Sequence, residues 1–269
     1  MRITAHLLSA RLFLAVAALL PLPAQACDLA LVLAVDVSGS VDATEYRIQM
    51  DGLAAGLRDG VVSEALVIAK AQVSLIQWSG RARQEVSIPW TTIGSFDDVE
   101  ALAQAIEAAP RPWRNFSTAL GEALLLGLNQ FSQAPDCSRR VIDLSGDGPS
   151  NEGVEPATLK PMLRAAGITV NAIAIEQSAP DLTAYFYEHV IRGEGAFVET
   201  AHRFADYPDK IRRKLVREIA RKTAGHQRGM SPASEPASGG TQGSAQGAEN
   251  WPTEVGLQKI AQRGADSAK

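Results

Sequence analysis

The chain has 269 residues, with 26 lysine and arginine residues against 30 aspartate and glutamate residues and a formal net charge of −4. A nucleic-acid-binding protein usually has a net basic balance, so this charge argues against a nucleic-acid partner. With 46% hydrophobic residues, the chain is long enough for one sizeable folded domain and an additional segment.

The first 26 residues have the pattern of a secretory signal peptide. Two arginines flank a short polar start, a nearly continuous apolar run covers residues 12–22, and Ala24-Gln25-Ala26 has the small residues of an A-x-A cleavage site. The apolar run is well short of the roughly 20 residues that a membrane-spanning helix needs, and no other stretch is apolar enough. We therefore expect no transmembrane segment, export to the periplasm or beyond, and Cys27 as the first mature residue. A lipid-anchored Cys27 is the alternative.

Predicted strands and helices alternate from residue 28 onward. Residues 28–36 (DLALVLAVD) form a near-continuous apolar run, which is typical of a strand buried on both faces of a parallel sheet. A helix over residues 42–59 follows, with Asp42 and Glu45 spaced as a capping box. Next in the chain come a strand over 71–79, a short edge strand over 84–90, and helices over 96–109 and 118–131.

The second half continues this alternation. In chain order it has a strand over 140–145, a turn-rich loop over 146–153, a helix over 156–166, a strand over 168–175, a helix over 181–191, a short strand over 195–200 and a helix over 206–222. Such alternation predicts an α/β fold in which a mostly parallel sheet has helices on both faces. From about residue 223, Gly, Ser, Ala, Gln, Pro and Glu dominate, which predicts a disordered tail over 223–269.

The loop after the first predicted strand contains a set of oxygen ligands. Asp36, Ser38 and Ser40 occupy alternate positions, and this spacing can turn their side chains to one side, while Gly39 removes steric limits on the turn. A carboxylate with two hydroxyls suits Mg²⁺, Mn²⁺ or Ca²⁺ rather than zinc or copper. Ligands of open α/β sheets gather at the carboxyl ends of the strands, where Asp36 lies. The alternative is that these side chains only cap the next helix.

Here the sequence resembles a known family. DVSGS at 36–40 is similar to the D-x-S-x-S signature of the metal-ion-dependent adhesion site (MIDAS) of von Willebrand factor A domains. The stretch TALGEAL at 118–124 resembles the second loop of that site, and VIDLSGDG at 141–148 resembles the third. Gly146 departs from the pattern, because many members have threonine there. The resemblance covers roughly residues 28–222 and looks closest to the uncharacterised bacterial branch called domain of unknown function 1194.

The resemblance implies a doubly wound sheet in the order 3-2-1-4-5-6, with one short antiparallel edge strand, in a domain over residues 27–222. It also implies a divalent cation, Mg²⁺ first and Mn²⁺ or Ca²⁺ as alternatives, that binds an Asp or Glu of an unknown protein partner. The implied ligands are Asp36, Ser38, Ser40, Thr118 and Asp147. The implied function is therefore that of an exported binding domain.

The implied sheet order also concerns the only two cysteines. It places the first and fourth long strands side by side, with their N-terminal ends level, so Cys27 and Cys137 are expected to form a disulfide. Export to an oxidising compartment favours the same pairing.

Weaker signals lie outside the ligand set. Trp113 and Phe116, near Thr118, are candidates for a partner-binding rim, or else pack within their loop. Asp143 lies inside a predicted strand, so we expect it to have a structural partner. The last helix has an apolar stripe and a basic face; the stripe is Ile211, Leu215 and Ile219.

Two other classes of function remain open. A hydrolase has less support, because Ser38 stands where a phosphoryl-transferring aspartate would need a second carboxylate, and Leu144-Ser145-Gly146 lacks the G-x-S-x-G pattern. No histidine can be placed near Asp36 in a strand-end loop. The remaining alternative is a metal-independent scaffold or assembly subunit of the envelope.

Overall fold

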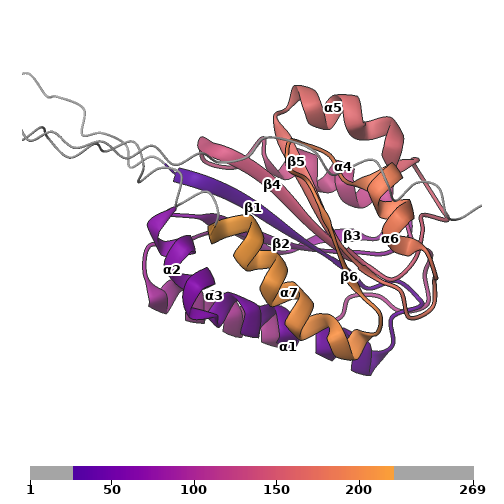
Figure 1. Ribbon diagram of the computed structural model, residues 1–269, viewed down its shortest axis with the longest axis horizontal. Helices are drawn as coiled ribbons and strands as arrows, with labels where there is room; N and C mark the ends of the chain where they lie inside the picture. The colour runs from indigo at the N-terminus through magenta and orange to yellow at the C-terminus, as the bar shows by residue number, and fades with distance from the viewer. Residues whose placement is uncertain (1–26, 221–269) are drawn as a thin grey trace, which may run out of the picture. The chain divides into compact units, whose positions relative to one another are not determined.

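The structure is a computed structural model that describes residues 27–220 (Figure 1). The predicted signal peptide and the predicted tail lie outside the described residues. Within the described range, no helix combines the length and the apolar character that crossing a membrane requires.

Six strands form one sheet in the order β3-β2-β1-β4-β5-β6. All neighbouring pairs are parallel except β2 and β3, which are antiparallel. The strands are β1 (Cys27–Asp36), β2 (Gln72–Trp78), β3 (Gln84–Thr92), β4 (Cys137–Gly146), β5 (Ile168–Ile175) and β6 (Val198–Ala201). The predicted fold class, sheet order and antiparallel edge strand are therefore confirmed.

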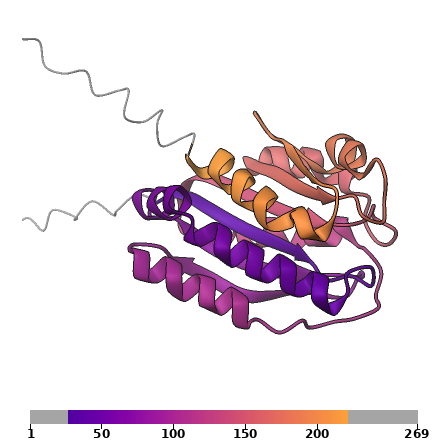
Figure 2. The same ribbon diagram turned by 60° about the horizontal axis from the view of Figure 1, so that its bottom comes forward.

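Helices cover both faces of this sheet (Figures 1 and 2). One face is covered by α1 (Ala43–Arg58), α2 (Gly60–Ile68), α3 (Phe96–Ala108) and α7 (Tyr207–Leu215), with the short turns η3 (Phe204–Asp206) and η4 (Val216–Ala220) at the ends of α7. The other face is covered by α4 (Leu120–Gln130), α5 (Lys160–Ala165) and α6 (Leu182–Tyr185), with the turns η1 (Pro156–Leu159) and η2 (Phe186–Val190).

The apolar run of β1 explains this two-sided burial. Successive strand residues point to opposite faces. Leu31 and Leu33 belong to the core under α1, α3 and α7, whereas Val32 and Ala34 belong to the core under α4 and α5. β1 is the central strand in both cores, and its C-terminal residue Asp36 is therefore held rigidly.

The helix α2 differs from the sequence prediction, which has no helix between residues 59 and 71. The predicted capping box of Asp42 and Glu45 starts α1. Asp59 then ends α1 and caps α2, because its side chain accepts a hydrogen bond from the Val61 amide at 3.0 Å. Gly60 at the first position disfavours a helix by propensity, and the packing of Val62 and Leu66 in the core compensates for it.

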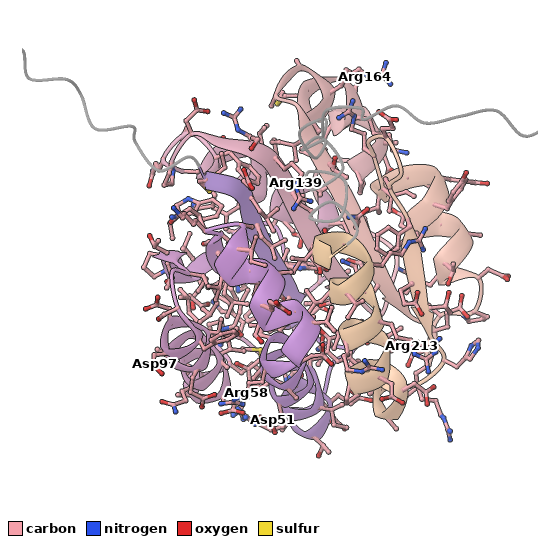
Figure 3. The ribbon with its side chains drawn as sticks, turned by 60° about the vertical axis from the view of Figure 1, so that its left-hand side comes forward. Asp51, Arg58, Asp97, Arg139, Arg164 and Arg213 are labelled. Carbon is pink, nitrogen blue, oxygen red and sulfur yellow. A yellow bond between two sulfur atoms is a disulfide. The ribbon has the colours of Figure 1, made fainter. Side chains whose placement is uncertain are left out.

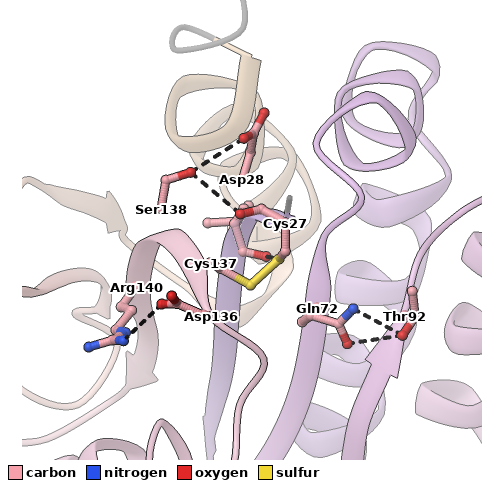
Figure 4. The surroundings of a disulfide bond; sticks show 9 residues. Cys27, Asp28, Gln72, Thr92, Asp136, Cys137, Ser138 and Arg140 are labelled. Carbon is pink, nitrogen blue, oxygen red and sulfur yellow. Dashed lines mark hydrogen bonds and ion pairs between the residues drawn. A yellow bond between two sulfur atoms is a disulfide. The ribbon is translucent and has the colours of Figure 1, made fainter. Parts of the chain in front are cut away.

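The predicted disulfide is present between Cys27 and Cys137 (Figure 4). The two residues are direct partners in the register of β1 and β4, and their Cα atoms lie 4.5 Å apart. The bond joins the two central strands at the edge opposite Asp36. It also uses the Cys27 sulfur, so a lipid thioether at Cys27 is incompatible with this structure.

Candidate functional site

Asp36 is the last residue of β1. Its side chain is fully buried and belongs to a cluster of polar side chains. Its Oδ1 accepts a hydrogen bond from the Ser38 amide at 2.7 Å, and its main-chain carbonyl accepts one from Gln49 of α1 at 3.2 Å. Its other carboxylate oxygen, Oδ2, is buried and has no hydrogen-bond partner among residues 27–220. One oxygen of this carboxylate is therefore available to a ligand.

Asp147, in the loop after β4, joins the same cluster through Ser40. The Ser40 hydroxyl donates to Asp147 Oδ1 at 2.6 Å, and the hydroxyl oxygens of Ser38 and Ser40 lie 3.2 Å apart. Asp147 Oδ2 is also buried and lacks a partner in the described part of the chain. Two loops that are 107 residues apart in the sequence thus bring two unpaired carboxylate oxygens into one cluster.

Thr118, the fifth predicted ligand, is joined to the third loop through its main chain. Its amide donates to the Asn151 side chain at 2.9 Å, and its carbonyl accepts from the Asn151 amide at 2.9 Å. Asn151 lies four residues after Asp147, so these bonds tie the second loop to the third. The Thr118 side chain is buried, but no hydrogen bond joins it to the other four predicted ligands within the described residues.

Gly39 allows the first and second loops to touch. Its amide donates to the Phe116 carbonyl at 2.8 Å. A Cβ at this position would lie 3.1 Å from both the Asn115 Cα and the Phe116 carbonyl oxygen. The need for glycine here comes from this close approach of two backbones.

Gly146 stands directly beside the unpaired oxygen of Asp36. A Cβ on Gly146 would lie 3.3 Å from Asp36 Oδ2 and 3.2 Å from the Phe186 ring. A side chain at this position would therefore crowd the carboxylate itself. The departure from the family pattern noted at Gly146 bears on the surroundings of a ligand as well as on packing.

Burial dominates the electrostatics of the two carboxylates. It raises the pKa of Asp36 to about 8, and the neighbouring charge of Asp147 contributes in the same direction. Burial also raises the pKa of Asp147. No lysine or arginine forms an ion pair with either carboxylate within residues 27–220. A positive ion between them would offset this cost, because it favours the charged form of both groups.

The donors of this cluster are carboxylate and hydroxyl oxygens. Hard oxygen donors of this kind bind Mg²⁺, Mn²⁺ and Ca²⁺. Among the residues that the structure describes, no group of three or more His, Cys, Asp or Glu side chains is placed to hold a metal. A cation at this site would therefore depend on the serine and threonine hydroxyls as well as on the two aspartates.

Arg111 contributes to the site and was not identified from the sequence. Its guanidinium donates to the carbonyls of Val37 at 3.2 Å and Ser38 at 2.8 Å, so it holds the backbone of the first loop. Gln49 was missed as well. Neither has a motif signal, because their contacts depend on how distant segments pack.

The two candidate rim residues differ in exposure. Phe116 is 38% exposed, and the Arg83 guanidinium lies 3.5 Å from the centre of its ring. Trp113 is half-buried and packs against the core under α1 and α3. Phe116 is therefore the more accessible of the two beside the first loop.

Asp143 has the structural partner that its position in a strand predicts. Its carboxylate lies 2.5 Å from the Lys214 ammonium group of α7, and both side chains are buried. Lys214 also contacts Glu218 at 3.0 Å. Lys214 is therefore not part of a basic face on the last helix, whereas Arg212, Arg213 and Arg217 are exposed.

Solved structures with a similar fold come from several organisms. Proximal thread matrix protein 1 from the mussel byssus is 20% identical, with a TM-score of 0.55 over 71% of this chain and 47% of that chain. A von Willebrand factor type A protein from Catenulispora acidiphila is 16% identical, with a TM-score of 0.52 over 72% of this chain and 43% of that chain. Another structure of the mussel protein, 21% identical with a TM-score of 0.54 over 72% of this chain and 48% of that chain, is described with a zinc-occupied MIDAS motif.

This chain spans less than half the length of these relatives, and at such identities the likeness concerns the fold alone. No curated protein matches the chain. The family described as Protein of unknown function (DUF1194) matches residues 26–223, which is most of the chain. The chain therefore belongs to the DUF1194 family, and its described domain has the von Willebrand factor A fold.

Proposed function

We propose that this chain is an exported binding domain that uses a divalent cation to bind an acidic group of a protein partner. The proposed ligands are Asp36, Ser38, Ser40, Thr118 and Asp147, in agreement with the family resemblance. The observation that carries the proposal is the pair of buried, unpaired oxygens, Asp36 Oδ2 and Asp147 Oδ2. Buried carboxylates without a partner are costly, and such groups are usually paired or coordinate a metal.

The cation we favour is Mg²⁺, with Mn²⁺ or Ca²⁺ as alternatives. Mg²⁺ takes six oxygen ligands and usually keeps several waters. The five proposed side chains leave at least one position to water. A carboxylate from an Asp or Glu of a partner can replace that water, and this exchange is the chemistry that the cation would supply.

Export is supported by two independent features. The predicted signal peptide precedes Cys27, and the Cys27–Cys137 disulfide is a bond that persists in oxidising compartments.

A metal-independent scaffold is the second candidate function. It is favoured by the direct bond from Ser40 to Asp147 at 2.6 Å and by the main-chain bonds between Thr118 and Asn151. These contacts can hold the three loops together without a cation. An enzyme has less support, since neither sequence nor site offers a recognised nucleophile with its base.

Calorimetric titration of the mature protein with Mg²⁺ and Mn²⁺ tests the metal. We expect saturable binding that Asp36→Ala abolishes and that Asp97→Ala preserves. Asp97 is an exposed aspartate in the first turn of α3, so it controls for the loss of one negative charge (Figure 3). A folded Asp36→Ala variant that binds metal as the parent does would contradict the proposed ligand set.

The partner is tested by pulldown from the native envelope. We expect a partner that is lost both with a chelator and with Asp36→Ala, and retained with Asp97→Ala. A partner that binds equally in all these conditions would support the scaffold and exclude the adhesion mechanism.

A further inference from the structure

A cavity lies at the edge of the sheet opposite the candidate metal site. Its volume is about 510 Å³, within the range of small-molecule sites. The N-terminal ends of β4 and β5, the segment before β6 and the turn η4 enclose it. Lining side chains include Ser138, Arg139, Arg140, Thr169, Phe197 and Arg217.

Arg139 is a half-buried guanidinium group in this cavity. It donates one hydrogen bond, to the Glu218 main-chain carbonyl at 3.3 Å. No carboxylate forms an ion pair with it within residues 27–220. Burial lowers the pKa of Arg139, because its charge is partly removed from water. An anion in the cavity would relieve this cost.

Arg217 presents a second guanidinium group from η4. The carbon of this group lies 3.7 Å from the centre of the Phe197 ring. This cation–π contact fixes the plane of the guanidinium group and leaves its N–H donors at the rim. Arg217 likewise has no carboxylate ion-pair partner in the described part of the chain.

The residues that line the cavity include three arginines, Arg139, Arg140 and Arg217, but only two acidic residues, Glu194 and Glu218. The Glu218 carboxylate accepts from Lys214 at 3.0 Å and from Asn171 at 2.8 Å, and it shares the charge of Lys214 with Asp143. Glu194 is exposed to solvent at the edge. The cavity therefore has an excess of positive charge on the Arg139 side.

The adjacent hollow is lined mainly by acidic rather than basic side chains. It has a volume of about 630 Å³ and shares Phe197 and Arg217 with the first cavity, but Glu176, Asp181 and Glu188 line it. Arg139 does not line that hollow. Anion binding is therefore favoured in the cavity that contains both arginines.

We propose that this cavity binds a small organic anion through Arg139 and Arg217, and that a carboxylate or phosphate group is the part recognised. Guanidinium groups offer paired N–H donors that match the oxygens of both groups. Thr169 is a further polar residue among those that line the cavity. The ligand is independent of the divalent cation, because the cavity lies at the other end of β4.

The test is calorimetric titration of the metal-free full-length mature protein with inorganic phosphate and, separately, with succinate, at constant ionic strength. Removing metal first prevents either probe from binding through a cation at Asp36. We expect saturable binding of at least one probe, weakened about tenfold or more by Arg139→Gln and by Arg217→Gln, as loss of a charged hydrogen bond implies. The tighter probe identifies phosphate or carboxylate as the recognised group.

Arg213→Gln is the matched control, because Arg213 is an exposed arginine of α7 that does not line the cavity (Figure 3). We expect the Arg213→Gln variant to bind each probe with the same affinity as the parent protein. Amide signals of Gly167 and Gly195 should shift in NMR spectra on titration, and those of Gly39 and Gly148 should not. Absence of saturable binding by both probes, or equal weakening by Arg213→Gln, would overturn the proposal. Melting temperatures of all variants establish that each is folded.

Discussion

The unpaired carboxylate oxygen of Asp36 depends on small residues around it. Gly146 leaves room beside Oδ2, and Gly39 lets the Phe116 carbonyl approach the first loop. At each position a methyl group would meet atoms at 3.1 to 3.3 Å. The shape of the candidate site therefore depends on the space left by these two glycines as well as on the oxygens that line it.

Gly39→Val is expected to separate the first two loops. Its branched side chain would meet the backbone of Asn115 and Phe116, and overpacking of this kind typically costs about 1–3 kcal/mol. We expect a lower unfolding free energy in urea and at least a tenfold loss of Mg²⁺ affinity. Gly60→Ala is the control, since a Cβ there meets nothing within 4 Å. Equal effects of the two substitutions would show that close approach is not the cause.

Spacing grouped Asp36, Ser38 and Ser40, and the family resemblance added Asp147, but neither predicted every contact of this loop. Asp36, Ser40 and Asp147 meet because strand ends of a parallel sheet share one edge, and this follows from the pattern of strands. Their role as metal ligands stays a prediction. Arg111 was missed because its hydrogen bonds reach a loop more than 70 residues earlier in the chain. Such contacts depend on packing, which local patterns do not encode.

Among the elements, α7 is joined to the sheet by charge as well as by apolar contact. Ile211 and Leu215 pack into the core, and Lys214 between them reaches Asp143 of β4. Helical spacing places residues 211, 214, 215 and 218 on one side. This spacing places Lys214 on the buried side of α7, although a lysine is rarely fully buried unless it is paired. The helix α2 shows the complementary case, in which packing outweighs an unfavourable glycine.

Lys214→Met is expected to destabilise the domain strongly. It would leave the buried carboxylates of Asp143 and Glu218 without their cation, and breaking a buried pair in this way costs about 3–5 kcal/mol. The comparison is Arg213→Met, an exposed change in the same helix, for which we expect about 0.5 kcal/mol or less. Urea unfolding of both variants measures the difference. Similar unfolding free energies would mean that the buried ion pair contributes little.

Across the described domain, one sheet separates two cores, and β1 and β4 link the candidate metal site to the disulfide edge. Both strands begin at the disulfide, and both end at a predicted ligand loop. The apolar strands indicated a parallel sheet, but they do not by themselves specify its order. That order came from the family resemblance, and it led to the correct cysteine pairing.

Reduction of the disulfide is expected to lower stability without removing the fold. The bond closes a loop with a sequence separation of 110 residues. In the chain-entropy model, release of such a loop costs about 5 kcal/mol. Urea unfolding with and without reductant measures this cost, and Cys27→Ser combined with Cys137→Ser should reproduce it. An unfolding midpoint that reductant leaves unchanged would count against this account.

The placement of Asp36 at one end of β1 and of Cys27 at the other has a mechanical consequence. A pull applied between the Asp36 loop and the disulfide edge of the sheet would run lengthwise along β1. Hydrogen bonds to β2 and β4 on both sides would then be loaded together in shear, rather than opened one at a time. The covalent bond to Cys137 would pass part of that load into β4, the strand that leads to Asp147. A load applied to the Asp36 loop would therefore be shared among β2, β1 and β4.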